Sequence, residues 1–458
     1  MKETRLDILT IIRQKSATQP DQLAFASTEP DGNLTFRELM VRADQVATKL
    51  IQRGCRKGER CGLIQYDGAD FLVSALGILA AGLCLVPVAT FLPAEEKDFV
   101  MKAAGLHWFY QEDRRLFRLP FAGPVDGQDD KEFRACDPAY IRFTSGTTGR
   151  RKGILLGQQA IIDRLNAANT VLQIGSSDRI WFALPMADHF VVSILLYLSR
   201  GATVLSNSNR ENWRESIERD QPTVAYGSPD FYQALMHSDV GSLDSLRLAI
   251  STTTPLSPEL AEDFARRFKK NLNPALGIIE VGLLTINTRP DKVGSVGLPM
   301  PDYAVTLVGE HGKPVKQGEI GELRIAGPGL MNAYLEPWRP INRLIKRYGY
   351  ATGDFASMDQ DGYLFLAGRG KNRLQIEGVQ FFCEEVETVL NTLPGVEESR
   401  VFMDSQSQTL VAELVGSPGP TEQLKELLRQ KIDSRKVPSR FQVVESLPRT
   451  ANGKLRRS

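Results

Sequence analysis

The sequence predicts an α/β fold: a large N-terminal domain of mostly parallel sheets covered by helices plus a small β subdomain, followed by a small mobile α+β C-terminal domain. From about residue 20 to 300, short apolar runs alternate with helical patterns, which is typical of parallel sheets covered by helices. Glycine and proline then become dense over residues 292–370. The length of 458 residues also exceeds what one hydrophobic core usually organises, so at least two domains are expected.

The domain boundary is expected at a glycine-rich, charged segment, AGRGKNR, at residues 367–373. The permissive backbone of such a segment suits a hinge. We therefore expect an N-terminal domain at residues 1–369, with the β subdomain at about 292–369, and a C-terminal domain at 370–458.

The individual elements follow from the apolar patterns in chain order. Strands are expected at AYIRF (139–143), RIWFALP (179–185), ATVLS (202–206), TVAYGS (223–228) and LRLAIS (246–251). Helices are expected at residues 158–172, 190–199, 211–219, 229–236 and 257–270. Beyond the hinge we expect a helix at 384–393, a pair of strands within 398–415 and an amphipathic helix at 421–433.

An uncharged run at residues 71–88, FLVSALGILAAGLCLVPV, is near the minimum length for a membrane span. Gly77, Gly82 and Pro87 interrupt it, and its second half is typical of a buried strand. We interpret the run as a buried helix followed by a strand, and we expect no membrane span.

Composition and charge narrow the classes of function. The net charge of +1 provides no general attraction for nucleic acid or anionic lipid, so any anionic ligand must be held by a local site. The five cysteines are odd in number and lack metal-ligand spacing, which fits a reducing compartment. The first 20 residues are polar and charged, unlike a signal peptide. We expect a cytoplasmic protein that does not bind nucleic acid.

A loop rich in glycine and hydroxyl residues, FTSGTTGRRKG at residues 143–153, lies between two apolar strands. Glycines let backbone N–H groups approach a phosphate, the hydroxyls add donors, and Lys152 adds charge. The alternative is a flexible hairpin tip, which has no need of four hydroxyl residues among glycines. The loop is not a Walker A motif, because its lysine is followed by glycine and a strand. The sequence therefore predicts a phosphate-binding loop.

This loop resembles the signature of the acyl-adenylate-forming superfamily, which includes acyl-CoA synthetases, aryl-acid ligases, luciferases and peptide-synthetase adenylation domains. The resemblance implies that the protein uses ATP to make an acyl-adenylate and then passes the acyl group to a thiol. It recurs in order in LTFRELM (34–40), ALGILAAGLCLVPV (75–88), GSVGLPMP (294–301), GEIGELRIAGPGLMNAYL (318–335), YATGDFASMDQDGYLFLAGRGK (350–371), EEVETVLNTLPGV (384–396) and VPSRFQVVESLPRTANGKLRR (437–457).

The resemblance implies a role for each matching residue. Glu280 would hold Mg²⁺ against the ATP phosphates, since Mg²⁺ prefers oxygen ligands. Lys454 would bridge the substrate carboxylate and the α-phosphate, so that Lys454, Glu280 and Thr144 form the catalytic set. Lys371 would be the hinge about which the C-terminal domain swivels between the two half-reactions. The residues implied to bind ATP are Thr144, Ser145, Gly146, Thr147, Thr148, Gly149, Lys152, Asp354 and Arg369.

Several positions depart from the family pattern. Leu276 cannot stack on adenine as an aromatic residue would, and Ile279 lacks a hydroxyl that usually touches the α-phosphate. STTTPL at residues 251–256 narrows the space beside the acyl group. Arg151 and Gln158 stand in place of proline and histidine. The alternative function is therefore that of a degenerate member, which binds nucleotide or a partner without turnover.

The resemblance places the acyl pocket around LPMADHF at residues 184–190, which is similar to the corresponding segment of aryl-acid ligases. His189 would face the substrate there, although it remains open whether Asp188 only caps a helix while His189 is structural. An amino-acid substrate is disfavoured, because the resemblance aligns His189 with the position where amino-acid adenylation domains carry an aspartate that holds the amine. The polar lining and reduced space favour a small to medium acid, aromatic acids included. The predicted pocket residues are His189, Tyr226, Ser228, Thr252 and Gly277.

The acceptor thiol is left open between coenzyme A and a separate acyl or peptidyl carrier protein, because no carrier domain follows Lys454. Arg435, Lys436 and Arg440 would serve either as a carrier-docking patch or as an ordinary solvated face.

Overall fold

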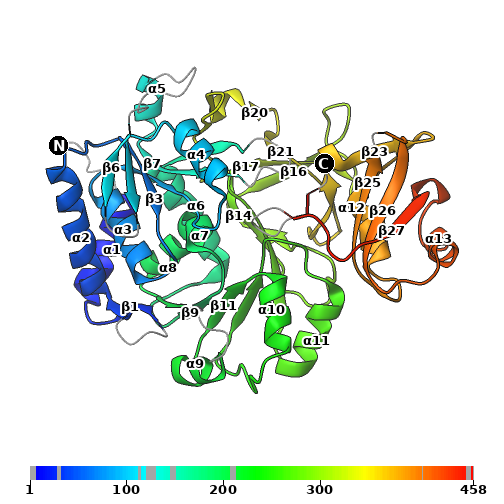
Figure 1. Cartoon of the computed structure of the whole chain (residues 1–458), viewed down its shortest axis with the longest axis horizontal. Coiled ribbons are helices and arrows are strands. Elements are labelled where there is room, and N and C mark those ends of the chain that lie inside the picture. The colour runs from blue at the N-terminus through cyan, green and yellow to red at the C-terminus, as the bar shows by residue number, and fades with distance from the viewer. Residues whose placement is uncertain are drawn as a thin grey trace. The chain divides into compact units, whose positions relative to one another are not determined.

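The computed structural model describes residues 7–27, 32–111, 115–119, 130–144, 151–206, 213–404, 406–449 and 455–456. The chain divides into two compact units (Figure 1). The first comprises residues 1–144, 152–304 and 326–344, and the second is built mainly from 305–325 and 345–458.

The larger sheet of the first unit has nine strands among the described residues. Neighbouring strands are parallel from β13 through to β1, as the alternating pattern predicted, and antiparallel at both ends. The order across the sheet is β15 (Leu298–Pro299), β14 (Gly282–Ile286), β13 (Leu272–Ile278), β12 (Leu248–Ser251), β11 (Val224–Gly227), β9 (Arg179–Phe182), β10 (Thr203–Ser206), β1 (Leu23–Ala26) and β2 (Leu34–Thr35).

The second sheet of the same unit has eight strands in the described ranges. Its middle strands are parallel, whereas β7 and β8 form an antiparallel hairpin around the predicted phosphate loop. The order is β19 (Arg339–Pro340), β18 (Ala333–Tyr334), β8 (Gly153–Gly157), β7 (Pro138–Phe143), β4 (Cys84–Pro87), β3 (Arg60–Ile64), β5 (Trp108–Gln111) and β6 (Leu116–Arg118).

The uncharged run at 71–88 forms a buried helix, α3 (Ala69–Ala80), followed by strand β4, as predicted. Helix α3 is buried on nearly all sides, with Ala69, Asp70 and Ala80 alone partly exposed, which accounts for its almost entirely apolar sequence. Over the described part of the chain, no helix combines the length and apolar character that crossing a bilayer requires.

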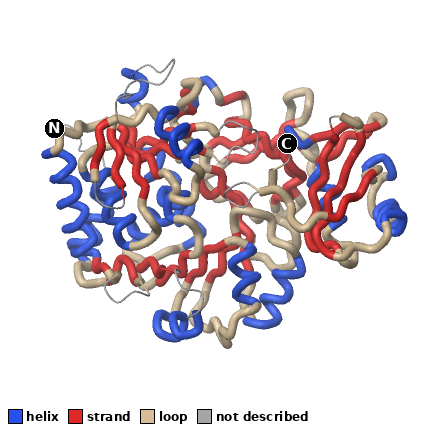
Figure 2. The backbone as a smooth tube through the Cα atoms, viewed as in Figure 1, coloured by secondary structure: helices blue, strands red, loops and turns tan. Residues whose placement is uncertain are grey.

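Helices cover both sheets (Figure 2). Helix α2 begins with a capping box, in which Thr35 accepts from the Glu38 N–H and the Glu38 carboxylate accepts from the Thr35 N–H. The helices are α1 (Ile8–Thr18), α2 (Phe36–Gln52), α4 (Ala94–Ala103), α5 (Asp130–Ala135), α6 (Gln158–Leu172), α7 (Met186–His189), α8 (Leu195–Arg200), α9 (Trp213–Asp220), α10 (Pro229–Met236) and α11 (Pro258–Phe268).

In the first unit, two predicted elements differ most from the structure. The single helix predicted at 190–199 is interrupted, since a π-helical segment, η1 (Phe190–Ile194), lies between α7 and α8. An apolar run fits any helical period, so the pattern does not reveal the wider turn. Strand β9 ends at Phe182 rather than at 185, because Pro185 begins the turn into α7.

The second unit contains a five-stranded sheet, a hairpin and a three-stranded sheet in its described residues. Helix α13 ends at Arg429, earlier than the predicted 433, because the Leu428 carbonyl accepts from both Lys431 and Ile432 and tightens the last turn. The elements are β16 (Ala304–Val308), β17 (Gly321–Ala326), β20 (Ile345–Lys346), β21 (Gly349–Met358), β22 (Leu364–Arg369), η4 (Gly370–Asn372), β23 (Arg373–Ile376), β24 (Val379–Phe382), α12 (Cys383–Leu390), β25 (Val396–Asp404), β26 (Thr409–Gly416), α13 (Thr421–Arg429), η5 (Ser434–Lys436) and β27 (Arg440–Val443).

Candidate active site

The two ends of the predicted phosphate loop are held together by the β7–β8 hairpin. Phe143 pairs with Gly153 across the hairpin. The Thr144 N–H then donates to the Lys152 carbonyl at 3.0 Å, and the Lys152 N–H donates to Thr144 Oγ1 at 3.2 Å. Lys152 is exposed and Thr144 half-buried, so both can reach a ligand. The remaining predicted ATP residues of this loop lie outside the described residues: Ser145, Gly146, Thr147, Thr148 and Gly149.

Glu280 lies on the tight turn between β13 and β14. Its carboxylate Oε1 accepts a hydrogen bond from the Tyr334 hydroxyl at 2.9 Å. The Lys152 ammonium nitrogen lies 5.1 Å from the centre of the Tyr334 ring, within cation–π range. Lys152 and Glu280 are distant in the sequence, yet both contact the Tyr334 side chain.

The backbone of this turn is bonded at three consecutive carbonyls. Arg164 Nη1 donates to Ile279 O at 3.0 Å, Met331 N donates to Glu280 O at 2.7 Å, and the Tyr303 hydroxyl donates to Val281 O at 3.0 Å. The Arg164 side chain is almost fully buried, and burial lowers its pKa to about 10 although the nearby Tyr303 and Glu280 raise it. At neutral pH the guanidinium is therefore still a cation.

The Glu280 carboxylate could hold a hard cation only if phosphate oxygens supplied further ligands. Within the described ranges, no group of three or more His, Cys, Asp or Glu side chains could hold a metal ion by itself. Mg²⁺, however, commonly binds through one or two carboxylates and takes its other ligands from substrate phosphates and water. The single carboxylate at the turn therefore fits Mg²⁺ that arrives with a nucleotide.

The predicted ribose residues lie in the second compact unit. Asp354 and Arg369 are a cross-strand pair on β21 and β22, and Arg369 Nε lies 2.8 Å from Asp354 Oδ1. Asp354 is 6% exposed, while the Arg369 side chain is about half exposed at 49%. Lys371 is exposed on η4. Lys454 lies outside the described residues.

Four of the five predicted acyl pocket residues, all but Gly277, lie at or after the carboxyl ends of parallel strands. The carboxyl ends of β9, β11 and β12 meet at one edge of the larger sheet, which is where open α/β sheets bind ligands. Tyr226 Oη lies 3.4 Å from His189 Nδ1, and the Tyr226 ring stacks on Phe182 at a centroid distance of 5.7 Å. Burial raises the pKa of Tyr226 to about 12, so its hydroxyl is a neutral hydrogen-bond donor at pH 7.

Asp188 forms an ion pair with Arg142. Arg142 Nη2 lies 3.3 Å from Asp188 Oδ1, and both side chains are mostly buried. The N-terminus of α7 is instead bonded by Asp67, whose Oδ1 accepts from the Met186 N–H at 3.0 Å. Asp188 therefore has an ion-pair partner beside the predicted pocket, and His189 next to it faces Tyr226.

Ser228 and Thr252 also have structural roles, whereas local packing does not require a glycine at Gly277. The Ser228 hydroxyl caps α10 by accepting from the Phe231 N–H at 3.3 Å. Gly277 is exposed, and a Cβ added there would meet nothing closer than Gly282 O at 3.4 Å. Thr252 is buried and its N–H donates to Gly227 O at 3.0 Å, which ties the loop after β12 to the end of β11.

Sequence reasoning missed Arg142, Arg164 and Tyr334. A signal existed for each of the two arginines, since a charged residue within an apolar strand or an apolar helical face needs a specific partner. Tyr334 lies at the end of the motif 318–335, but no pattern indicated which of its residues would contact Glu280.

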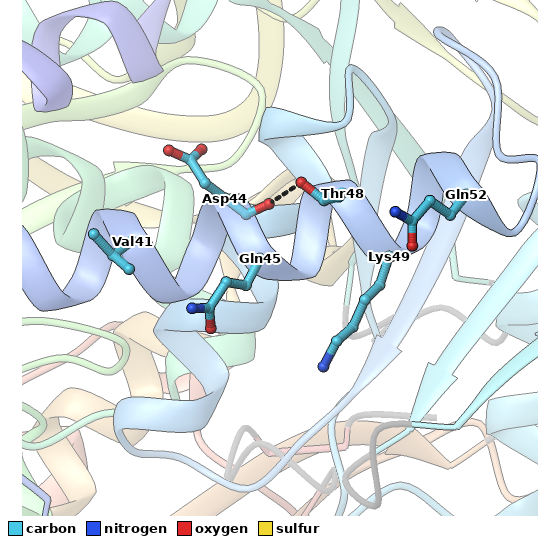
Figure 3. A pocket seen from close by; sticks show the side chains of 6 residues that line it. All are labelled: Val41, Asp44, Gln45, Thr48, Lys49 and Gln52. Atoms are coloured by element: carbon cyan, nitrogen blue, oxygen red, sulfur yellow. Dashed lines mark hydrogen bonds between the residues drawn. The ribbon is translucent and has the colours of Figure 1, made fainter.

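An open pocket of about 510 Å³ lies elsewhere, along one face of α2 (Figure 3). The side chains that line it all come from this helix, where the Thr48 hydroxyl donates to Asp44 O at 2.8 Å. It contains none of the predicted site residues and offers no convergent set of groups. The lining residues are Val41, Asp44, Gln45, Thr48, Lys49 and Gln52.

Comparison with known proteins places this geometry in a family. Residues 12–335 match the model for AMP-binding enzymes, and residues 385–454 match the model for the AMP-binding enzyme C-terminal domain. The chain belongs to the family of AMP-binding enzymes, which confirms the resemblance found in the sequence.

Similar proteins include a feruloyl-CoA synthase from an Amycolatopsis species, 27% identical over 92% of this chain and 92% of that protein. Phosphinothricin tripeptide synthetase PhsC of Streptomyces viridochromogenes is 27% identical over 98% of this chain, which spans only 44% of that protein. The crystal structure of ATP-bound MatB from Rhodopseudomonas palustris has a TM-score of 0.85 at 23% identity, covering 98% of this chain and 97% of that one. This likeness confirms the predicted fold class.

Proposed function

We propose that the protein uses ATP to convert a carboxylic acid into an acyl-adenylate and then transfers the acyl group to a thiol. The observation that carries the proposal is the meeting of Lys152, Glu280 and Tyr334 beside the ends of the phosphate loop. Membership of the AMP-binding enzyme family supports it.

In the first half-reaction, a carboxylate oxygen attacks the α-phosphorus and pyrophosphate leaves. Thr144 and Lys152 would bind the phosphates, and Lys454 would stabilise the approach of the two anions. Mg²⁺, when bound with ATP, would neutralise charge on the phosphate oxygens, and Glu280 would hold it. Asp354 would bind the ribose hydroxyls, with Arg369 as a second ribose or phosphate contact.

In the second half-reaction, a thiol attacks the carbonyl carbon of the mixed anhydride and AMP leaves. The C-terminal domain, at residues 370–458, would swivel about Lys371 between the two steps. The acceptor is coenzyme A or a separate carrier protein; the similar proteins include a CoA synthase and a tripeptide synthetase, so both acceptors have support. The whole reaction is proposed to take place in the cytoplasm.

The basic residues considered for carrier docking are all paired with carboxylates in the structure. Arg435 contacts Asp433 at 2.6 Å, Lys436 contacts Glu385 at 2.7 Å and Arg440 contacts Asp404 at 3.3 Å. This pairing favours an ordinary solvated face over a docking patch for an acidic carrier.

The acyl substrate is proposed to be a small or medium acid, aromatic acids included. His189, Tyr226 and Phe182 offer ring faces and two polar groups at the carboxyl edge of the larger sheet. The similar feruloyl-CoA synthase carries an aromatic acid in its name, which supports an aryl substrate.

The direct test is exchange of labelled pyrophosphate into ATP across a panel of aryl and fatty acids, with Mg²⁺ present. The proposal predicts exchange that depends on one class of acid and that falls at least 100-fold in Glu280→Gln. An acid that supports exchange is then offered coenzyme A or a carrier protein as the acceptor. ATP binding without exchange for any acid would instead support the degenerate family member.

Lys454→Ala separates the two half-reactions. Because the ammonium is needed only where two anions meet, we expect this variant to lose acid-dependent exchange while it still forms thioester from supplied acyl-AMP. Equal loss in both assays would contradict the role proposed for Lys454.

A further inference from the structure

Arg164 is a charged side chain deep in the first unit. It lies on α6, is 2% exposed, and forms no ion pair with a carboxylate among the described residues. Its guanidinium binds two carbonyls from separate segments: Nη1 lies 3.0 Å from Ile279 O, while Nη2 and Nε lie 2.6 and 3.1 Å from Gly329 O. The planar guanidinium presents several N–H donors in a rigid fork, which lets it span two such acceptors.

Two glycines enclose this arginine. A Cβ at Gly329, where φ is +72°, would lie 2.6 Å from Arg164 Cβ, and one at Gly282, where φ is +103°, would lie 3.2 Å from the same atom. Backbone on both sides therefore contacts the arginine side chain closely. This arrangement leaves little room for the two segments to shift while Arg164 is in place.

Both segments carry a residue of the candidate site. Ile279 immediately precedes Glu280, and the segment that begins at Gly329 continues to Met331, which binds Glu280 O, and to Tyr334, which binds the Glu280 carboxylate. Arg164 thus joins the backbone that carries the acid to the backbone that carries its hydrogen-bond donor.

We propose that Arg164 is a positioning residue that fixes Glu280 relative to Tyr334 and thereby sets the affinity of the ATP site for Mg²⁺. The inference rests on the proposed function, since it assigns Glu280 to the cation that accompanies ATP. Mg²⁺ demands near-ideal octahedral geometry, so a small displacement of a single carboxylate ligand weakens binding. Residues that orient a metal ligand typically change metal affinity by about 10- to 100-fold when they are replaced.

Arg60 provides a matched control. It is equally buried at 2%, but it lies on β3, in the other sheet from the Glu280 turn, with its guanidinium 5.1 Å from the centre of the Phe133 ring. Replacing either arginine by methionine removes a buried cation of the same size. Only the Arg164 replacement removes the link between Ile279 and Gly329.

The experiment measures the midpoint of thermal unfolding at fixed ATP while Mg²⁺ is titrated, with ATP plus EDTA as the baseline. In the wild type we expect a Mg²⁺-dependent rise of the midpoint. Arg164→Lys, which keeps the charge but not the fork, should need about 10-fold more Mg²⁺ for half of that rise, and Arg164→Met should need more still. Arg60→Met should unfold at a lower temperature but keep the wild-type Mg²⁺ requirement.

An unchanged Mg²⁺ requirement in folded Arg164→Met would overturn the inference and leave Arg164 with a structural role alone. If Arg164→Met does not fold, Arg164→Lys decides in the same assay. A wild type without any Mg²⁺-dependent rise would contradict the proposed function itself, whereas a normal wild type with unchanged Arg164 variants would contradict only this inference.

Discussion

Thr253 has an unusual backbone for its residue type. It follows β12 in the segment predicted to narrow the acyl site, and its φ is +80°. A β-branched side chain rarely adopts this left-handed region, at a strain of about 1–3 kcal/mol. Such strain often occurs at ligand-binding loops, and here it lies next to Thr252, which is bonded to the end of β11.

Thr253→Gly should raise the free energy of unfolding by about 1 kcal/mol, because glycine relieves the strain and only part of the gain is lost to its greater freedom when unfolded. The same change at Thr254, which has no positive φ, should lower stability by up to about 1 kcal/mol. Thermal unfolding of both variants measures the difference. A loss of stability in Thr253→Gly would show that the loop is not strained as described.

At the scale of single residues, the sequence identified candidate site residues better than it predicted which residues contact one another. Glu280 and Lys152 were identified from motifs, and the structure places both against Tyr334. Arg142 and Arg164 were not, because their partners Asp188, Ile279 and Gly329 are distant in sequence. Local patterns carry no information about such pairs.

At the scale of elements, the close approach of two strands explains why one of the motifs contains a glycine. Gly297, in GSVGLPMP, has φ of +102°, and a Cβ there would lie 2.0 Å from the carbonyl carbon and oxygen of Ile286. The adjoining Leu298 pairs with Ile286 across β15 and β14. Gly297 is therefore required because the backbones of β15 and β14 approach closely at the edge of the larger sheet. Strand β14 directly follows the turn that carries Glu280.

Gly297→Ala should destabilise the protein by more than about 2 kcal/mol, since both the backbone conformation and the contact exclude a side chain. Gly241→Ala is the matched control, because nothing lies within 4 Å of its added Cβ, and its effect should be within about 1 kcal/mol of zero. Thermal unfolding of the two variants makes the comparison. Equal effects would contradict the close approach seen at Gly297.

Hydrogen bonds to Asp178 join the segments that precede three neighbouring strands of the larger sheet, β9, β11 and β12. Burial alone would raise the pKa of Asp178, but hydrogen bonds from Arg247 and Thr223 lower it overall. Arg247 Nη2 lies 2.8 Å from Asp178 Oδ2, and the Thr223 hydroxyl lies 2.7 Å from Oδ1. The folded pKa of Asp178 therefore lies below the unfolded value near 3.9. The ionised carboxylate adds fully to the free energy of unfolding above about pH 4, and this stabilisation is lost as the pH falls through the folded pKa.

Asp178→Asn should therefore lower the free energy of unfolding by about 1–2 kcal/mol at pH 7, and by progressively less below pH 4. The value is kept small because Arg247 is partly exposed and solvent screens its ion pair with Asp178. Asp291→Asn, which alters an exposed pair with Arg289, should have little effect at any pH. Unfolding midpoints between pH 7 and pH 3 test this. A deficit in Asp178→Asn that stays constant with pH would exclude the ionised carboxylate as its cause.

Helix boundaries were predictable where the apolar pattern was clear. The helices at 158–172 and 229–236 occur exactly where the periodicity placed them, and the second begins with a Ser-Pro cap. The break at Phe190–Ile194 was not predictable, because every residue of that run is apolar or small. The break lies immediately after His189, the last residue of α7, and π-helical turns are common at functional sites.

At the scale of the whole molecule, the order of motifs predicted the family and the fold class. Several motifs in one order constrain a fold more than any single motif does, and this is why the prediction succeeded at low sequence identity to known structures. The swivel about Lys371 and the approach of Lys454 remain predictions, because they concern movement between two reaction states.

The most direct test of the central claim follows the carboxylate oxygen. An acid that supports pyrophosphate exchange is labelled with ¹⁸O in both carboxyl oxygens and converted to thioester in one reaction with ATP and the accepted thiol. Attack on the α-phosphorus predicts one ¹⁸O atom in the released AMP and none in pyrophosphate, as mass spectrometry would show. Label in inorganic phosphate, with ADP as the nucleotide product, would mean that the acid attacks the γ-phosphorus and would contradict acyl-adenylate formation.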